Sequence, residues 1–326
     1  DVDIYEAGHK KLKQTKLKAE EWGEKLTGLQ IKDPIQLLAI YHEGIREGRT
    51  SVHPWQVRVC REFARPREAG HVNRVSLRAN NGSGKSQLTV APCAVWLAVA
   101  FKKSRCVITS SSGTQLDRQT GRAVVNLCKA INDVHGEELF KCNYRYITFL
   151  PTGSTIEMYA TDDEQKAEGY HPHDMDCEFA IIVDEAKSVE PKIYEAISRC
   201  NGMTRRMDVS SPGGPIGHFF SICGNNEIAP GRFHRVGKWL TMRVTYEECP
   251  HISKDELEEA IERYGFESAW FKSAYRAMFT SIDETLVMTW EQIQQILKQN
   301  LPWHRSERFA GLDLSAGADE YVVSIF

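Results

Sequence analysis

Residues Val75–Ser86 read VSLRANNGSGKS. Apolar Val75 and Leu77 alternate with polar neighbours, which predicts a short strand over Val75–Ala79. The glycines that follow favour a tight loop, and the apolar segment to about Ala100 predicts a helix after it. A strand that passes through such a loop into a helix is the setting in which a P-loop binds phosphate.

The loop matches the P-loop pattern G-x-x-x-x-G-K-[S/T], except that Ala79 stands at the position of the first glycine. Glycines let backbone N–H groups surround the phosphates at the positive end of the following helix. We therefore expect Lys85 to bind the β- and γ-phosphates of ATP and Ser86 to bind Mg²⁺. The rest of the predicted ATP-binding loop consists of Asn80, Asn81, Gly82, Ser83 and Gly84.

A second signal is the apolar run Ala180–Val183, which is followed by Asp184 and Glu185. Any strand can end in acids at a solvated loop, but this strand follows a P-loop at the spacing of a Walker B segment. The carboxyl end of such a strand places Asp184 beside Mg²⁺ and Glu185 near the γ-phosphate. We expect Glu185 to polarise the attacking water.

Two flanking segments fit the same site. Gln56 follows Trp55 upstream of the loop, where an amide can read the adenine edge and an aromatic ring can stack; a surface turn is the alternative. Ser210 and Ser211 end a predicted strand, Met207–Val209, where their hydroxyls can sense the γ-phosphate and pass its state onward. A plain turn after the strand is the alternative there.

Strands and helices alternate from about Arg74 to Pro212, which predicts a mostly parallel sheet flanked by helices. This is the α/β fold of a P-loop NTPase of the RecA/ASCE type. The other predicted strands are Cys106–Ser110, Tyr146–Leu150, Thr155–Tyr159 and Phe179–Val183.

The sequence changes character after Arg232. A capping box at Ser253 and Glu256 predicts a helix that ends near Gly265. Two more helices, at about 267–278 and 290–298, precede two strands at 309–314 and 321–326. We expect an N-terminal helical arm (1–50), an ATPase core (51–245), a helical linker (246–305) and the beginning of a further domain (306–326).

Composition limits the remaining classes. The 326 residues include 41 Lys and Arg against 44 Asp and Glu, a net charge of -3, so a nucleic-acid site has to be a local patch. No apolar stretch approaches the roughly 18 residues that a membrane helix needs. The 9 cysteines never form CxxC, which indicates a reducing cytoplasm. The lysine-rich stretch His9–Lys25 is either a solvated helix or an arm that contacts phosphate or a partner.

In their order along the chain, Gln56, the P-loop, Asp184-Glu185 and the segment Ser210–Gly214 resemble the ATPase half of a large terminase subunit from a tailed bacteriophage. The resemblance extends from Trp55 to the last residue and is weakest between Ser221 and Arg308. It implies that Gln56 binds adenine, that Glu185 is catalytic, and that Ser210 and Ser211 couple hydrolysis to movement.

Members of this family continue into an RNase H-like nuclease domain whose first strand ends in a metal-binding aspartate. Asp313 matches that position, and Asp319 is a looser match to a nearby acid. The resemblance implies Mg²⁺ or Mn²⁺ as the nuclease cofactor. A two-metal site needs several converging carboxylates, so we expect the nuclease site to be incomplete in this chain.

The resemblance also implies a motor that hydrolyses ATP to drive double-stranded DNA into a procapsid. Its implied partners are the portal protein of the procapsid, the small terminase subunit and further copies of the chain, commonly five in all. It would act in the host-cell cytoplasm and transiently on the procapsid, without a membrane, and would not remain in the mature virion. DNA contacts to phosphate would be largely independent of sequence.

One departure from the family concerns catalysis. Many terminases carry an Arg inside Walker A where Asn81 stands here, and Arg78 lies just before the loop instead. An arginine finger is worth on the order of 10³ to 10⁵ in rate. We expect Arg78 or another subunit to supply that charge. Further candidates, each also explained as a surface or DNA-facing residue, are Arg118, Arg122, Arg205 and Arg206.

Three alternatives stay open. His171–Cys177 contains two histidines, two aspartates and a cysteine, which suggests a metal site, although a connecting loop is favoured. A helicase-like DNA translocase predicts a second RecA-like domain after Gly214 and an arginine motif. An ATP-gated assembly or DNA-binding module predicts nucleotide binding without turnover.

Overall fold

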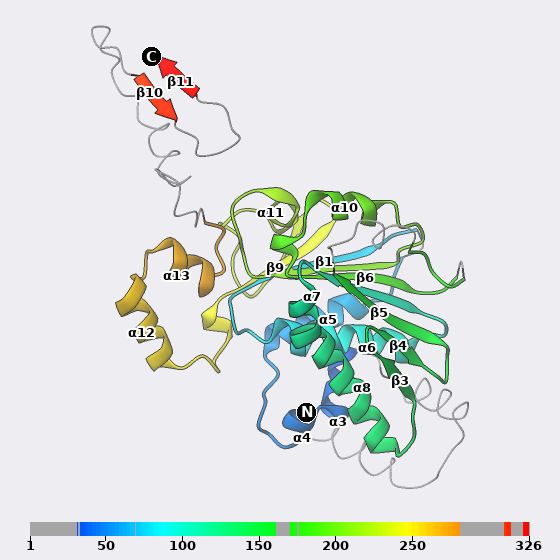
Figure 1. The fold of residues 1–326 in the computed structure, drawn as a ribbon. Coiled ribbons are helices and arrows are strands. Elements are labelled where there is room, and N and C mark those ends of the chain that lie inside the picture. The colour runs from blue at the N-terminus through cyan, green and yellow to red at the C-terminus, as the bar shows by residue number, and fades with distance from the viewer. Residues whose placement is uncertain are drawn as a thin grey trace. The chain divides into compact units, whose positions relative to one another are not determined.

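The computed structural model describes residues 31, 33–68, 70–160, 170–174, 176–280, 310–313 and 322–325. The chain divides into two compact units, Asp1–Ile282 and Asp283–Phe326 (Figure 1). In the second unit, β10 (Ala310–Asp313) pairs antiparallel with β11 (Val322–Ile325), which agrees with the two strands expected there. The predicted helices at 9–25 and 290–298 lie outside the described residues.

The first unit is built on one nine-stranded sheet. Six neighbouring strands are parallel, and each edge of the sheet is completed by antiparallel pairing. This confirms the predicted, mostly parallel sheet. In spatial order the strands are β3 (Phe140–Asn143), β4 (Tyr146–Phe149), β5 (Ser154–Ala160), β2 (Arg105–Ser110), β6 (Phe179–Asp184), β7 (Arg205–Ser210), β1 (Asn73–Ala79), β9 (Trp239–Val244) and β8 (Phe233–Val236).

Both faces of the sheet are buried because helices cover each of them (Figure 1). Along β2, Cys106 and Ile108 belong to the larger apolar cluster, whereas Val107 belongs to the smaller one on the opposite face. The larger cluster includes α3 (Pro34–Tyr41), α5 (Pro54–Ala64), α6 (Ala91–Ala100) and α8 (Arg122–His135). The smaller one includes α10 (Pro191–Ser198) and α11 (Gly217–Cys223).

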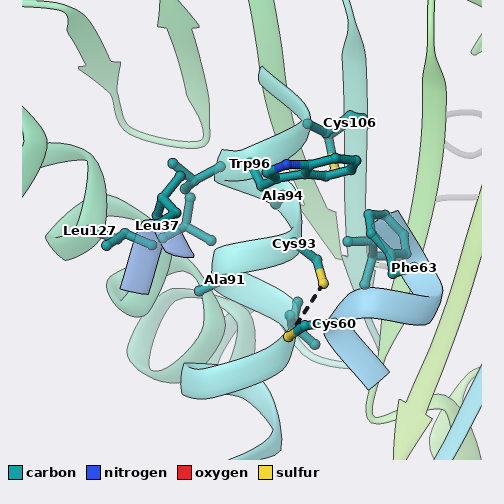
Figure 2. Packing of buried hydrophobic residues seen from close by; sticks show 14 of the residues in the cluster. Leu37, Cys60, Phe63, Ala91, Cys93, Ala94, Trp96, Cys106 and Leu127 are labelled. Atoms are coloured by element: carbon teal, nitrogen blue, oxygen red, sulfur yellow. Dashed lines mark hydrogen bonds between the residues drawn. The ribbon is translucent and has the colours of Figure 1, made fainter. Parts of the chain in front are cut away.

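Helix α6 is the centre of the larger cluster. Its sequence, APCAVWLAVA, is apolar all round, as expected of a helix that is buried on every side. The Trp96 ring meets Phe63 and Phe101 edge-on, and its indole N–H donates to the Ile31 carbonyl at 2.9 Å. Figure 2 shows Trp96 and Phe63 in this cluster, together with Cys60 and Cys93, whose sulfurs make a buried contact of 3.9 Å. The helix that follows the glycine-rich loop is thereby fixed in place.

Two short helices after β9 complete the first unit. The α12 helix (Lys254–Tyr264) begins as predicted, with the Glu256 amide donating to Ser253 Oγ, and ends at Gly265, whose φ is +83°. The α13 helix (Ala269–Ala274) is shorter than the predicted helix at 267–278. No helix of the described segments has both the length and the apolar character that a membrane crossing requires.

Candidate nucleotide-binding site

The site begins where β1 ends and the chain turns into the π-helical turn Ser86–Val90, which continues into α6. Gly82 and Gly84 have φ values of +71° and +78°, a backbone region that favours glycine. The first helical bond runs from the Leu88 amide to the Gly84 carbonyl at 2.8 Å. The predicted strand, loop and helix are therefore all present.

Two side chains hold the carbonyls of the loop. His251, which precedes α12, contacts the Gly82 carbonyl through Nε2 at 2.9 Å, and Gln56 Nε2 donates to the Ser83 carbonyl at 3.2 Å. In a trans peptide the N–H points opposite to the C=O. The amides of Ser83 and Gly84 are therefore turned away from Gln56 and His251. The Ser83 amide is thus opposite His251 and the Gly84 amide opposite Gln56, and successive backbone amides in such a loop are donors that can bind an anion.

His251 is itself held by a second histidine. Because the Gly82 carbonyl can only accept, His251 Nε2 donates to it and the Nδ1 atom of a neutral His251 faces His53 Nε2 at 2.8 Å. The two rings stack with centroids 5.0 Å apart. Burial, and secondarily the charge of His251, lower the pKa of His53. This arrangement links the start of α5 to the phosphate loop.

Lys85 is a buried cation, with 9% of its surface exposed. Within the described part of the chain its ammonium makes no hydrogen bond or ion pair. The Ser83 hydroxyl is buried as well and has no hydrogen-bond partner among these residues. An anion in the loop would satisfy both groups.

The Asp184 carboxylate lies at the carboxyl end of β6 and is 2% exposed. Ser86 Oγ donates to Asp184 Oδ2 at 2.8 Å, Thr120 Oγ1 donates to the same oxygen, and the Glu185 amide donates to Oδ1 at 3.0 Å. Mg²⁺ is usually held by one or two carboxylates together with substrate phosphates and water. The hard oxygen donors of Ser86 and Asp184 fit that ion.

Glu185 joins this carboxylate to the segment that follows β7. Its φ is +52°, so the chain turns sharply directly after Asp184. Ser210 Oγ donates to Glu185 Oε2 at 3.3 Å, and Lys187 Nζ donates to Ser211 Oγ at 2.7 Å. Both serines predicted to couple hydrolysis to movement are therefore bonded to the segment that directly follows β6.

Gln56 and Trp55 lie differently from a simple adenine-reading pair. The Gln56 amide is fully buried, and it accepts from the His53 amide at 2.8 Å while it donates to the Ser83 carbonyl. Trp55 belongs to the apolar core, with 1% of its surface exposed. In this structure Gln56 therefore contacts the phosphate loop, and its role at adenine stays a prediction.

Arg78 points to another part of the molecule. Its guanidinium donates to the Gly224 and Asn225 carbonyls and to the Asn226 side chain, and it lies 4.6 Å from the Phe279 ring centre. Burial lowers its pKa to about 10. Successive side chains of a strand point to opposite faces of the sheet, so a position next to the loop in sequence does not turn the Arg78 side chain toward the loop. The expected catalytic placement of Arg78 does not occur in this structure.

The other candidate arginines fall into two groups. Arg205 pairs with Glu178 at 3.1 Å and Arg206 with Asp208 at 2.6 Å, both largely buried, so both are structural cations. The second group, Arg118 and Arg122, is exposed near the start of α8 and makes no ion pair or hydrogen bond within the segments that the structure describes.

The residues between His171 and Cys177 contact separate partners. His173 Nε2 lies 2.9 Å from Thr155 Oγ1, and Asp174 pairs with Lys103 at 2.9 Å. Over the described ranges, no cluster of three or more His, Cys, Asp or Glu side chains is placed to hold a metal ion. The segment therefore connects strands β5 and β6 without a described metal cluster.

The predicted nuclease residues are placed only in part. Asp313 is the last residue of β10 and is paired with Val322 of β11. Asp319 lies outside the described residues. The end of a strand is the position that the resemblance assigns to Asp313.

Sequence reasoning missed four residues of the site: His53, Thr120, Lys187 and His251. Thr120 and His251 reach it from the turn before α8 and from beyond β9, and no local pattern marks them. Lys187 lies three residues after Asp184, so the Walker B segment itself was the available signal.

This fold is that of bacteriophage large terminase ATPase domains. The large terminase of the thermophilic bacteriophage D6E has a TM-score of 0.54 at 13% identity, over 82% of this chain and 63% of that one. The Thermus phage P74-26 large terminase ATPase domain has a TM-score of 0.52 at 16% identity, over 73% of this chain and 98% of that one. The HK97 bacteriophage large terminase has a TM-score of 0.53 at 14% identity, over 90% of this chain and 67% of that one.

At these identities the likeness concerns the fold. Structures of the D6E protein with ADP and with ATP-γ-S have the same fold, with TM-scores of 0.53 and 0.51. This chain spans 63% of the length of the D6E large terminase. No family model matches the sequence, and no curated protein matches it either.

Proposed function

We propose that this chain is the ATPase of a viral DNA-packaging motor, which hydrolyses ATP to drive double-stranded DNA into a procapsid. The observation that carries the proposal is Lys85, a side chain with 9% of its surface exposed whose ammonium makes no bond among the described residues. It lies beside a loop in which the Ser83 amide is turned away from His251 and the Gly84 amide away from Gln56. A triphosphate supplies the missing charge. The terminase fold adds the context of DNA packaging.

The side chains divide the chemistry of hydrolysis among them. Lys85 binds the β- and γ-phosphates, and Ser86 and Asp184 hold Mg²⁺, which neutralises phosphate charge when it is bound. Glu185 accepts a proton from the attacking water. The oxygen of that water bonds to the γ-phosphorus, and the bond between the γ-phosphorus and the oxygen that leaves with ADP breaks. Ser210 donates to Glu185 and so reports this event to the segment after β7.

The proposal extends to partners and to the second unit. The motor would act as a homo-oligomer, commonly a pentamer, on the portal protein in the host cytoplasm, with the small terminase subunit as a further partner. Phosphate contacts make its DNA affinity fall with rising salt. Asp313 would be the first metal ligand of a Mg²⁺- or Mn²⁺-dependent nuclease that needs further residues.

The helicase-like alternative calls for a second RecA-like domain after Gly214. The described residues from Pro215 to Thr280 instead contribute α11, β8, β9, α12 and α13 to the first unit, and β8 and β9 extend its only described sheet. This arrangement supports a single ATPase core followed by a different domain.

The decisive experiment is steady-state ATP hydrolysis with and without duplex DNA. We expect Glu185→Ala to lower turnover by about 10²- to 10⁴-fold while ATP still binds, because it removes the base. Lys85→Ala should weaken ATP binding roughly 10- to 100-fold, because it removes a charged phosphate contact. Duplex DNA should stimulate the wild type.

Glu195→Ala, which removes an exposed carboxylate on α10, is the matched control and should behave as the wild type. Tight ATP binding by the wild type without turnover, with or without DNA, would favour the ATP-gated binding module. Turnover that Glu185→Ala leaves unchanged would contradict the assigned role of that residue.

A further inference from the structure

The proposed ATPase lacks an assigned cation for the charge that develops on the γ-phosphate. Asn81 is neutral, and the guanidinium of Arg78 is engaged by the residues after α11. Arg205 and Arg206 are committed to buried ion pairs. Lys85 is a single charge, whereas phosphoryl transfer commonly uses a second cationic side chain.

Lys187 is the lysine that the fold brings to this place. Lys187 lies in the 3₁₀ turn Ala186–Ser188. This turn directly follows Glu185, whose backbone is left-handed, so the backbone at Glu185 sets the direction in which the Lys187 side chain leaves the chain. Its Nζ donates to Ser211 Oγ at 2.7 Å. A Cβ atom added to Gly213 would lie 3.4 Å from Lys187 Cβ and 3.6 Å from its Cδ, so the aliphatic stem runs along that glycine.

The charges that face Lys187 are those of the catalytic site. Burial lowers the pKa of Lys187. The negative charge of Glu185 acts against this effect, and the positive charge of Lys85 adds to it. Two ammonium groups and one carboxylate therefore share this region. An ammonium has three donors, so the bond to Ser211 leaves two for another acceptor.

We propose that Lys187 binds the γ-phosphate of the nucleoside triphosphate and is the catalytic cation that this chain supplies from its own Walker B segment. The inference rests on the proposed ATPase function. Lys187 also donates to Ser211, so the same ammonium contacts the γ-phosphate and the segment after β7. The presence or absence of that phosphate is thereby transmitted to Ser211 without an intervening residue.

Binding of two nucleotides tests the assignment, because only one of them has a γ-phosphate. In the full chain with Mg²⁺, Lys187→Met should bind ATP-γ-S roughly 10- to 100-fold more weakly, because a charged hydrogen bond is lost. Its affinity for ADP should stay within about threefold, and kcat should fall by at least about 10²-fold. Methionine keeps an unbranched stem along Gly213, and Lys187→Arg, which keeps the charge, should restore most of the discrimination.

Lys192→Met, which removes an exposed lysine on α10, is the matched control and should leave both affinities and kcat unchanged. Equal losses of ATP-γ-S and ADP affinity in Lys187→Met would overturn the proposal, since they indicate a structural role. Unchanged kcat and affinities would overturn it too and would point to a cation from another subunit. The proposed function fails separately, if the wild type and Lys85→Ala hydrolyse ATP equally or not at all.

Discussion

At the scale of single residues, the phosphate loop depends on side chains that lie far from it in the sequence. Gln56 and His251 orient the peptides of the loop, and Thr120 donates to the Asp184 carboxylate. Lys187 connects the segment after Asp184 to Ser211. Lys85 and Glu185 can be read from local sequence, because the chemistry of phosphate transfer demands them there. The residues that orient the site come from tertiary contacts that no local pattern encodes.

The histidine pair gives the site a dependence on pH. Burial and the neighbouring His251 lower the pKa of His53 below its ordinary value of 6.5, so the folded protein keeps it neutral where the unfolded chain binds a proton. This contribution to stability is complete above pH 6.5 and is lost as the pH falls below it.

We therefore expect the free energy of unfolding to decrease from pH 7 to pH 5.5 with a His53 contribution of up to about 1.4 kcal/mol per pH unit. His53→Asn keeps a side chain suited to the N-cap of α5 and removes the titration, so its slope should be smaller. Urea unfolding at several pH values measures both slopes. Identical slopes would show that His53 takes no part.

At the scale of elements, the two glycines of the loop differ in what surrounds them. Both have positive φ, but a Cβ on Gly84 would lie 3.3 Å from Gln56 Nε2, whereas a Cβ on Gly82 meets nothing within 4 Å. Each Ala substitution should cost about 1–2 kcal/mol for the left-handed backbone. Gly84→Ala should cost more, because it also displaces the Gln56 amide from the Ser83 carbonyl.

Urea unfolding without nucleotide checks this comparison, since only the protein's own contacts then differ. Equal losses of stability for Gly82→Ala and Gly84→Ala would mean that Gln56 moves freely and does not hold the loop.

The elements were predictable where the sequence pattern was strong. The strand before the loop, the apolar strand before Asp184 and the helix capped by Ser253 are all present within a few residues of their expected bounds. Strands β3, β8 and β9 and helix α11 were not predicted. Strand β9 carries Thr241 and Arg243 at buried positions, so its sequence lacks the apolar run expected of a strand inside a sheet.

The same limit explains Arg78. Its place next to the loop suggested a catalytic role, but β1 alternates its side chains between two faces, and the acceptors for Arg78 come from residues after α11. Sequence proximity to the loop did not determine the direction of the side chain.

At the scale of the whole molecule, the first unit contains every described residue of the nucleotide site. The loop reaches as far as α13, because the Asn81 amide donates to the Ala274 carbonyl at 2.9 Å, and Ser273 Oγ donates to the Pro212 carbonyl at 3.3 Å. All of these residues precede the unit boundary at Ile282.

A chain that ends after Ile282 should therefore keep its fold and its affinity for ATP. We expect its thermal midpoint to lie within about 2 °C of that of the full chain, which corresponds to less than about 1 kcal/mol. Thermal unfolding and titration with ATP measure both quantities. A large loss of either would place part of the nucleotide site in the second unit.

The order of the strands also bears on how the protein is made. Strand β1 carries the phosphate loop, yet its two neighbours in the sheet, β7 and β9, begin only at Arg205 and Trp239. The Asn80 amide is then anchored to the Val244 carbonyl. During synthesis β1 therefore emerges early, and both of its edges stay unpaired until β7 and β9 have been made. Strands with unpaired edges are prone to misassociate. The loop cannot gain this anchor until Val244 has left the ribosome, so a part of the site that is translated early is among the last to be assembled.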